Sequence, residues 1–122
     1  MTDHDSRGRG LAERLADALD REATGAFRVV DRTRRVAPTP DGAFAYAIAA
    51  DGTALAEVFV APERVRVEFT AAQERAARAG ADADLRVRPK ATRPPRTLAF
   101  VESPGDVERA LDAFEAVLTA VE

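Results

Sequence analysis

The sequence predicts an α+β domain in which helices cover one face of an antiparallel sheet of five or six strands. Two apolar runs, 43–50 and 53–60, flank Asp51-Gly52, a dipeptide typical of two-residue hairpin turns. Residues 64–69 alternate between apolar and charged side chains, as in a strand with one buried face. Helical patterns open and close the chain. Strands and helices do not alternate, which disfavours a doubly wound parallel sheet.

The first predicted element is an amphipathic helix over residues 9–23. Its leucines recur at every fourth position, so they share one face. Thr24-Gly25 is expected to end the helix, with glycine in the left-handed conformation. Residues 1–8 show no periodicity, and we expect them to form a disordered tail ahead of a single domain spanning 9–122.

Strands follow this helix. One is expected from Phe27 to Arg32, with a continuation to Ala37 left open, and the prolines beyond it end the strand because proline cannot donate to a ladder. The hairpin comes next. Its tight turn makes Tyr46 and Glu57 direct cross-strand neighbours on a face of large side chains.

The second half is expected to add a short helix, two strands and a long helix. Thr70 and Gln73 have the spacing of a capping box and open the short helix, which ends at Gly80. A short strand is cut by Pro89, and the last strand spans 97–102. The final helix has an N-cap at Ser103 and then a proline. The predicted order is α-β-β-β-β-α-β-β-α.

The composition of the chain limits the classes of protein to which it can belong. The 122 residues suit one domain, and the absence of cysteine excludes disulfides, thiolate ligands and a cysteine nucleophile. No apolar run suits a signal peptide or a membrane span, so we expect a cytoplasmic protein without membrane contact. Arginine supplies almost all of the positive charge and the net charge is −3. The preference for arginine over lysine is typical of a GC-rich genome, and the mild excess of acidic residues is compatible with a halophilic source.

No set of residues has the pattern of a catalytic or cofactor site. The single histidine, His4, falls in the expected tail, and Ser103 is assigned to a helix cap. Asp82 and Asp84 have the spacing of metal-loop ligands, but nothing completes a ligand set, which favours a solvated turn. We therefore predict no catalytic, cofactor-binding or metal-binding residues, and a protein that is not an enzyme.

Two groups of residues are candidates for binding. Tyr46 and Glu57 form either a polar pair in a small apolar pocket or a pair near the sheet edge, where the glutamate reaches water or bonds the Tyr46 hydroxyl or an arginine. Two basic clusters could contact phosphates or an acidic protein, or could simply be balanced by nearby acids. The first cluster comprises Arg32, Arg34 and Arg35, and the second comprises Arg86, Arg88, Lys90, Arg93 and Arg96.

The order of elements resembles the small α+β fold of the type III secretion chaperones and the YbjN-like proteins, and a similar order occurs in YjbR-like domains. The hairpin at 43–60, the strand at 64–69 and the final helix from Pro104 carry this likeness. It is a likeness of topology without a shared motif. It implies a non-catalytic, often dimeric, protein-binding domain.

Two function hypotheses follow from the sequence. The first is an interaction or accessory protein, chaperone-like, that binds another macromolecule or itself through a strand edge, a helix face or the alanine-rich side of the hairpin. The second is a nucleic-acid or phosphate-binding module that uses the two basic clusters. Convergence of both clusters on one face without intervening acids would favour the second hypothesis.

Overall fold

The computed structural model describes residues 4–22 and 25–122. Its elements are α1 (His4–Asp20), β1 (Phe27–Val30), β2 (Ala43–Ala50), β3 (Thr53–Val60), β4 (Val65–Phe69), α2 (Gln73–Asp82), β5 (Arg86–Lys90), β6 (Arg96–Val101) and α3 (Pro104–Val121). This order confirms the predicted α+β fold.

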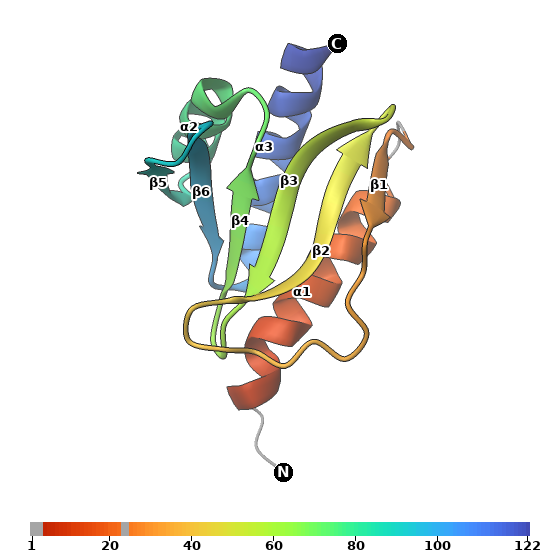
Figure 1. Ribbon diagram of the computed structural model, residues 1–122, viewed down its shortest axis with the longest axis vertical. Helices are drawn as coiled ribbons and strands as arrows, with labels where there is room; N and C mark the ends of the chain where they lie inside the picture. Colours follow the sequence, from red (N-terminus) through yellow and green to blue (C-terminus); the bar gives the residue numbers. More distant parts are fainter. Residues whose placement is uncertain (1–3, 23–24) are drawn as a thin grey trace.

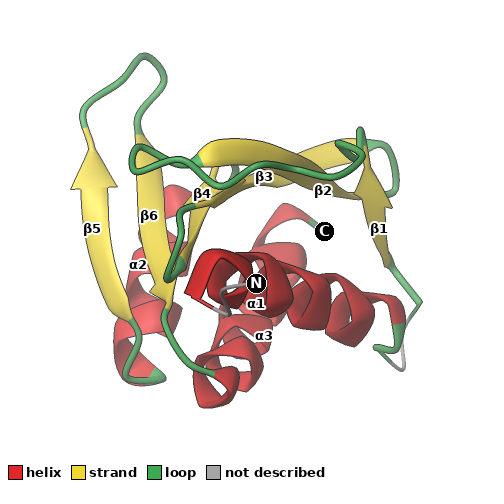
Figure 2. Ribbon diagram, turned by 90° about the horizontal axis from the view of Figure 1, so that it is seen from below, coloured by secondary structure: helices red, strands yellow, loops and turns green. Residues whose placement is uncertain are grey.

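The strands form one antiparallel sheet in the order β1-β2-β3-β4-β6-β5. All three helices lie on the same side of this sheet (Figure 2). No described helix covers the opposite side, which we call the open face; it is toward the viewer in Figure 1. The loop between β1 and β2 runs along one end of the sheet (Figure 1).

The apolar core fills the space between the sheet and the helices. Phe114 of α3 is fully buried, and its ring centroid lies 5.9 Å from that of Phe27 and 4.9 Å from that of Phe69. Val107 and Leu118 of the same helix are also buried. A core of this kind holds the sheet in place beneath the open face.

Helix α1 begins at His4 rather than at residue 9 and ends at Asp20. The tail prediction is therefore wrong for residues 4–8, and residues 1–3 lie outside the described chain. This added stretch makes a tertiary contact, in which the Gly8 N–H donates to the Pro62 carbonyl over 3.0 Å. A Cβ at Gly8 would lie 1.9 Å from the Ala61 oxygen, so only glycine allows this close approach. Local periodicity could not reveal that contact.

The hairpin turn is confirmed. Ala50 pairs with Thr53, and Asp51 and Gly52 have φ angles of 51° and 79°, as a type I′ turn requires. The register beyond the turn differs from the prediction because it shifts twice, between Ile48 and Ala49 and between Phe44 and Tyr46.

Each shift places an extra residue in one strand and so reverses the facing of the residues that follow. Because the shift between Ile48 and Ala49 comes before Tyr46 when counted from the turn, Tyr46 pairs with Val58, and Glu57 pairs with Ala47. The predicted Tyr46–Glu57 pairing is therefore wrong. A count that assumes uniform alternation from the turn cannot detect such irregularities.

Several boundaries also differ from the expected ones. Strand β1 ends at Val30, so the expected continuation toward Ala37 is loop. The capping box at Thr70 and Gln73 does not form. The N-cap of α2 is Ala72, in the left-handed conformation with no side-chain cap bond, and the helix runs to Asp82. Strand β5 continues through Pro89 because it lies at the edge of the sheet, where a missing N–H is tolerated.

Ser103 occupies the N-cap of α3, as predicted, but its hydroxyl makes no cap hydrogen bond. Asp106, in the first turn of the helix, instead reaches back to the residue before the cap, and its carboxylate accepts the Glu102 N–H over 3.0 Å. Within the described residues, none of the three helices has the length and apolar character needed to span a bilayer.

Candidate binding surface on the open face

Every charged side chain of the six strands points to the open face. The strands carry six basic and two acidic residues, a net charge of +4. They are Arg28, Arg66, Arg86, Arg88, Lys90, Arg96, Glu57 and Glu68. The helices, counted from Arg7, carry six basic and nine acidic residues, a net charge of −3. The fold thus separates charge into a basic sheet face and an acidic helix layer.

A network of five charged side chains occupies the side of this face formed by β3, β4, β6 and β5. At its centre is Glu68, whose side chain is only 1% exposed. Its carboxylate accepts hydrogen bonds from Arg66 Nε at 2.8 Å, from Arg96 Nη1 at 2.9 Å and from Lys90 Nζ at 3.2 Å. Arg96 Nη1 also donates to Glu57 over 2.9 Å. We call these five residues the Glu68 network.

The Glu68 carboxylate is ionised. Burial acts to raise its pKa, but hydrogen bonds from Arg96, Arg66 and Lys90 outweigh burial, so the pKa of Glu68 is lowered. The same network raises the pKa of Arg96, chiefly through its hydrogen bond to Glu57. Glu68 faces away from the core, so the side chains of its own cationic partners seal it from water. It is a carboxylate that fixes the position of three cations.

The network holds more positive than negative charge, with three cations against two carboxylates. Arg88 lies in the same cross-sheet row as Glu57 and Glu68, since its partner in β6 is Leu98. Arg88 is exposed and forms no ion pair within the described chain. The β5 end of the open face therefore has accessible positive charge that no neighbouring acid balances.

Aromatic rings and guanidinium groups alternate along a neighbouring row. In register, Phe59, Arg66, Phe100 and Arg86 cross β3, β4, β6 and β5. The Arg66 guanidinium lies 4.6 Å from the Phe59 ring centroid. Arg64, just before β4, lies 4.2 Å from the Phe100 centroid. These cation–π contacts cover faces of both rings.

The interleaving of rings and guanidinium groups was missed in the sequence because it arises between strands rather than within one segment. The only signal was the alternation of Arg66 with apolar neighbours, which places it on the open face. Which rings lie beside it depends on the strand order, which no local pattern specifies.

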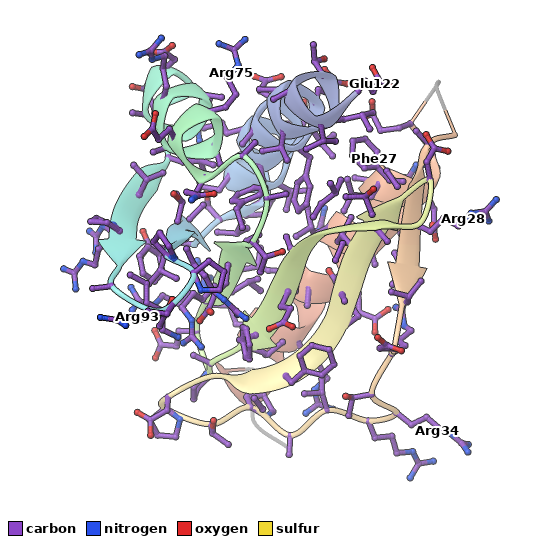
Figure 3. All side chains as sticks on the ribbon, turned by 45° about the horizontal axis from the view of Figure 1, so that its top comes forward. Phe27, Arg28, Arg34, Arg75, Arg93 and Glu122 are labelled. Atoms are coloured by element: carbon purple, nitrogen blue, oxygen red, sulfur yellow. The ribbon has the colours of Figure 1, made fainter. Side chains whose placement is uncertain are left out.

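The two basic clusters predicted from the sequence do not converge. Arg34 lies in the β1–β2 loop and Arg93 in the β5–β6 loop, at opposite sides of the molecule (Figure 3). Arg32 turns toward α1, where it contacts Glu13 at 3.4 Å and lies 5.5 Å from the Tyr46 ring centroid. Arg34 and its neighbour Arg35 are exposed.

The second cluster is itself divided. Lys90 and Arg96 are held in the Glu68 network, and Arg86 is 3.8 Å from Glu102. Only Arg88 and Arg93 remain exposed and without an ion pair inside the described ranges. Acidic side chains thus balance part of this cluster, and Arg88 and Arg93 remain available to bind a partner.

Tyr46 and Glu57 line neither a shared pocket nor a sheet edge, because they lie on opposite faces. Tyr46 is buried against α1, and its hydroxyl donates to the Ala12 carbonyl over 2.6 Å. Burial is the main cause of the raised pKa of Tyr46. Glu57 belongs to the Glu68 network on the open face. The tyrosine therefore has a structural role, and the glutamate belongs to the candidate surface.

Over residues 4–22 and 25–122, no three His, Asp or Glu side chains are grouped so that they could hold a metal ion. Asp82 is exposed at the end of α2, and Asp84 is exposed in the turn that follows.

The sequence matches a family profile over residues 1–122, and that family, DUF7993, is described as one of unknown function. The chain belongs to this family. No curated protein and no solved structure matches the chain. Membership of the family carries no activity with it, so the function has to be argued from the surface itself.

Proposed function

We propose that the protein is a non-enzymatic interaction protein that binds an acidic macromolecular partner through the open face of its sheet. The observation that supports this most directly is the separation of charge. A chain with a net charge of −3 presents a net charge of +4 on its strands. A local field of this sign raises the encounter rate with an acidic surface.

The face is a better docking surface than either edge. Strand β5 carries Pro89 and three cations, which are features that protect an edge from strand addition. Strand β1, at the other edge, is only four residues long. A partner that lies across the face also reaches the Glu68 network directly. The resemblance to secretion chaperones and YbjN-like proteins implies the same class of function, a protein-binding accessory domain.

A direct test is binding of a fluorescein-labelled oligo-glutamate peptide, followed by fluorescence anisotropy, with an oligo-glutamine peptide of equal length as the control. We expect salt-sensitive binding of the acidic peptide alone. A variant with Arg75→Ala and Arg78→Ala removes two exposed cations from the helix layer and should bind as the wild type does. Equal affinity for both peptides, or no binding of oligo-glutamate at low salt, would rule the proposal out.

A nucleic acid is the second candidate partner. The observation that favours it is the row in which Phe59 and Phe100 alternate with Arg66 and Arg86, since aromatic rings and guanidinium groups on an open sheet can stack bases. Three findings disfavour it. The two basic clusters are far apart, guanidinium groups already cover faces of these rings, and two carboxylates lie in the Glu68 network.

Binding of mixed-sequence single-stranded DNA and RNA at low salt tests this alternative. Even non-specific nucleic-acid binders show dissociation constants of ~0.1 mM or tighter. Binding in that range, together with no binding of oligo-glutamate, would replace the first proposal by the second.

A further inference from the structure

The β5 end of the open face combines three features that do not occur together elsewhere on the described part of this face. It has more cations than acids, it has cations without an ion pair, and it has cations already fixed in place by Glu68. The side chain of Lys90 is 42% exposed, so its ammonium reaches solvent while it contacts Glu68. An ammonium has three donors, which leaves capacity for a further acceptor.

We propose that Arg88, Lys90 and Arg93 bind a carboxylate-bearing segment of an acidic polypeptide, and that Glu68 acts as a positioning residue for this site. The inference rests on the proposed function and adds the location and the chemical class of the partner. Because the Glu68 network carries one more cation than carboxylates, a carboxylate from outside brings it to neutrality.

Part of the site is ordered before a partner arrives. Glu68 holds Lys90 and Arg96 by direct hydrogen bonds, so little side-chain freedom is lost when an acidic group binds. The loop that carries Arg93 is restrained as well. Thr92 N–H donates to the Lys90 carbonyl over 2.9 Å, and the Thr92 hydroxyl donates to the Pro94 carbonyl over 2.8 Å. The β5–β6 hairpin projects at this side of the sheet (Figure 2), where a partner can reach it.

A polypeptide suits this site better than a nucleic acid. A phosphate backbone carries a negative charge at every nucleotide, and its path across the sheet would pass the carboxylate of Glu57, whose side chain is 38% exposed. A polypeptide can place a carboxylate against Arg88 and Lys90 and a neutral or basic residue against Glu57. Base stacking would also require displacement of the guanidinium groups that cover Phe59 and Phe100.

The test uses the oligo-glutamate peptide with three variants of the full chain, each checked for folding by circular dichroism. In the first, Arg88→Ala and Arg93→Ala remove the two exposed cations that lack an ion pair, and affinity should fall roughly three- to tenfold. In the matched control, Arg34→Ala and Arg35→Ala remove the same charge from the opposite edge, and affinity should change by less than about twofold. Neither pair makes an ion pair within the described chain, so the fold is expected to survive.

The third variant separates binding from stability. Glu57→Gln keeps the shape of the side chain and increases the excess of cations, so affinity for oligo-glutamate should rise by roughly two- to fivefold. An unchanged affinity would show that oligo-glutamate binds out of reach of the Glu68 network, and would overturn the role given to Glu68. Oligo-thymidylate, tested on the same variants, identifies the class of partner, and sedimentation at low and high salt identifies self-association.

The outcomes are distinguishable. Equal losses in the Arg88/Arg93 and Arg34/Arg35 variants would overturn the site and leave the proposed function standing. Absence of any binding of oligo-glutamate would overturn both. Equally tight binding of oligo-thymidylate, lost in the Arg88/Arg93 variant, would overturn the choice of a polypeptide. A salt-sensitive dimer broken by that variant would show that a second copy of the chain, not another protein, occupies the site.

Discussion

The sequence places Glu68 on the correct face of the sheet but does not predict that its side chain is buried. Alternation in 64–69 assigns it to the side away from the core, which the sequence interpretation took to be solvated. The side chain is instead 1% exposed because cations from β4, β5 and β6 close over it. Burial was invisible in the sequence, because it depends on which strands flank β4.

Replacement of Glu68 by glutamine should destabilise the protein at neutral pH. It leaves Arg66, Lys90 and Arg96 close together without their central carboxylate, and hydrogen bonds to charged groups are worth about 1.5–3 kcal/mol each. We expect Glu68→Gln to lower the free energy of unfolding by about 2–3 kcal/mol at pH 7.

The effect should depend on pH in a defined direction. The folded-state pKa of Glu68 lies below its ordinary value of 4.5, so its stabilising contribution is complete above that pH. It is lost as the pH falls through the lowered folded-state pKa. Urea unfolding of both proteins at several pH values measures this, with Glu63→Gln, in an exposed turn, as the control. A difference that stays constant into the acid range would contradict the ionised network.

Tyr46 provides a spectroscopic check of the packing between α1 and the sheet. It is the only tyrosine and the chain has no tryptophan, so phenolate absorbance reports on one group. Burial raises its pKa above the ordinary value of 10.0. We expect no phenolate near pH 10 in the folded protein, and its appearance only together with alkaline unfolding. Free titration near pH 10, before any change in circular dichroism, would show that Tyr46 is not buried against Ala12.

At the scale of elements, local sequence signals were sufficient to predict the order of the helices and strands, but not which residues pair between neighbouring strands. Turn chemistry at Asp51-Gly52 and alternation in 64–69 act between neighbours in the chain, so they predicted the hairpin and β4. The extra residues at the two register shifts, Leu55 in β3 and Ala45 in β2, are both buried, so tertiary packing accommodates them. Turn chemistry encodes neither shift, and the Tyr46–Glu57 prediction failed because the shift at Leu55 lies between the turn and Tyr46.

The hairpin turn itself can be tested by substitution. Gly52 has a φ of +79°, and a Cβ added there would meet no atom within 4 Å, so strain in the backbone is the only cost of a side chain. Gly52→Val should destabilise by roughly 1–2 kcal/mol, because a β-branched residue resists the left-handed region. Asp51→Asn should be nearly silent, since asparagine also suits this turn. Thermal melts decide, and equal melting temperatures for all three proteins would exclude a type I′ turn.

At the scale of the molecule, the proposed function depends on the separation of charge between two layers. The net charge of −3 predicts weak interaction with any acidic partner, whereas the strands alone carry +4. The sequence interpretation identified the basic clusters but could not locate them. Their separation became visible only with β1 and β5 at opposite edges of the sheet.

The salt concentration should determine which of these charges interact with an approaching partner. The Debye length is about 30 Å at 0.01 M and about 10 Å at 0.1 M, so at the higher salt concentration only nearby charges act on an approaching peptide. The test is to compare the association rates of oligo-glutamate with two variants of the chain. Arg28→Gln with Arg86→Gln removes positive charge from the open face, and Glu108→Gln with Asp112→Asn removes negative charge from exposed positions on α3.

At about 0.01 M salt the first variant should slow association and the second should accelerate it, because the field of the whole molecule reaches the peptide. At about 0.1 M the first effect should persist and the second should disappear, because α3 lies behind the sheet. Stopped-flow fluorescence measures both rates. If the α3 variant still accelerates association at the higher salt concentration, the peptide approaches the helix layer, and the open face is not its docking surface.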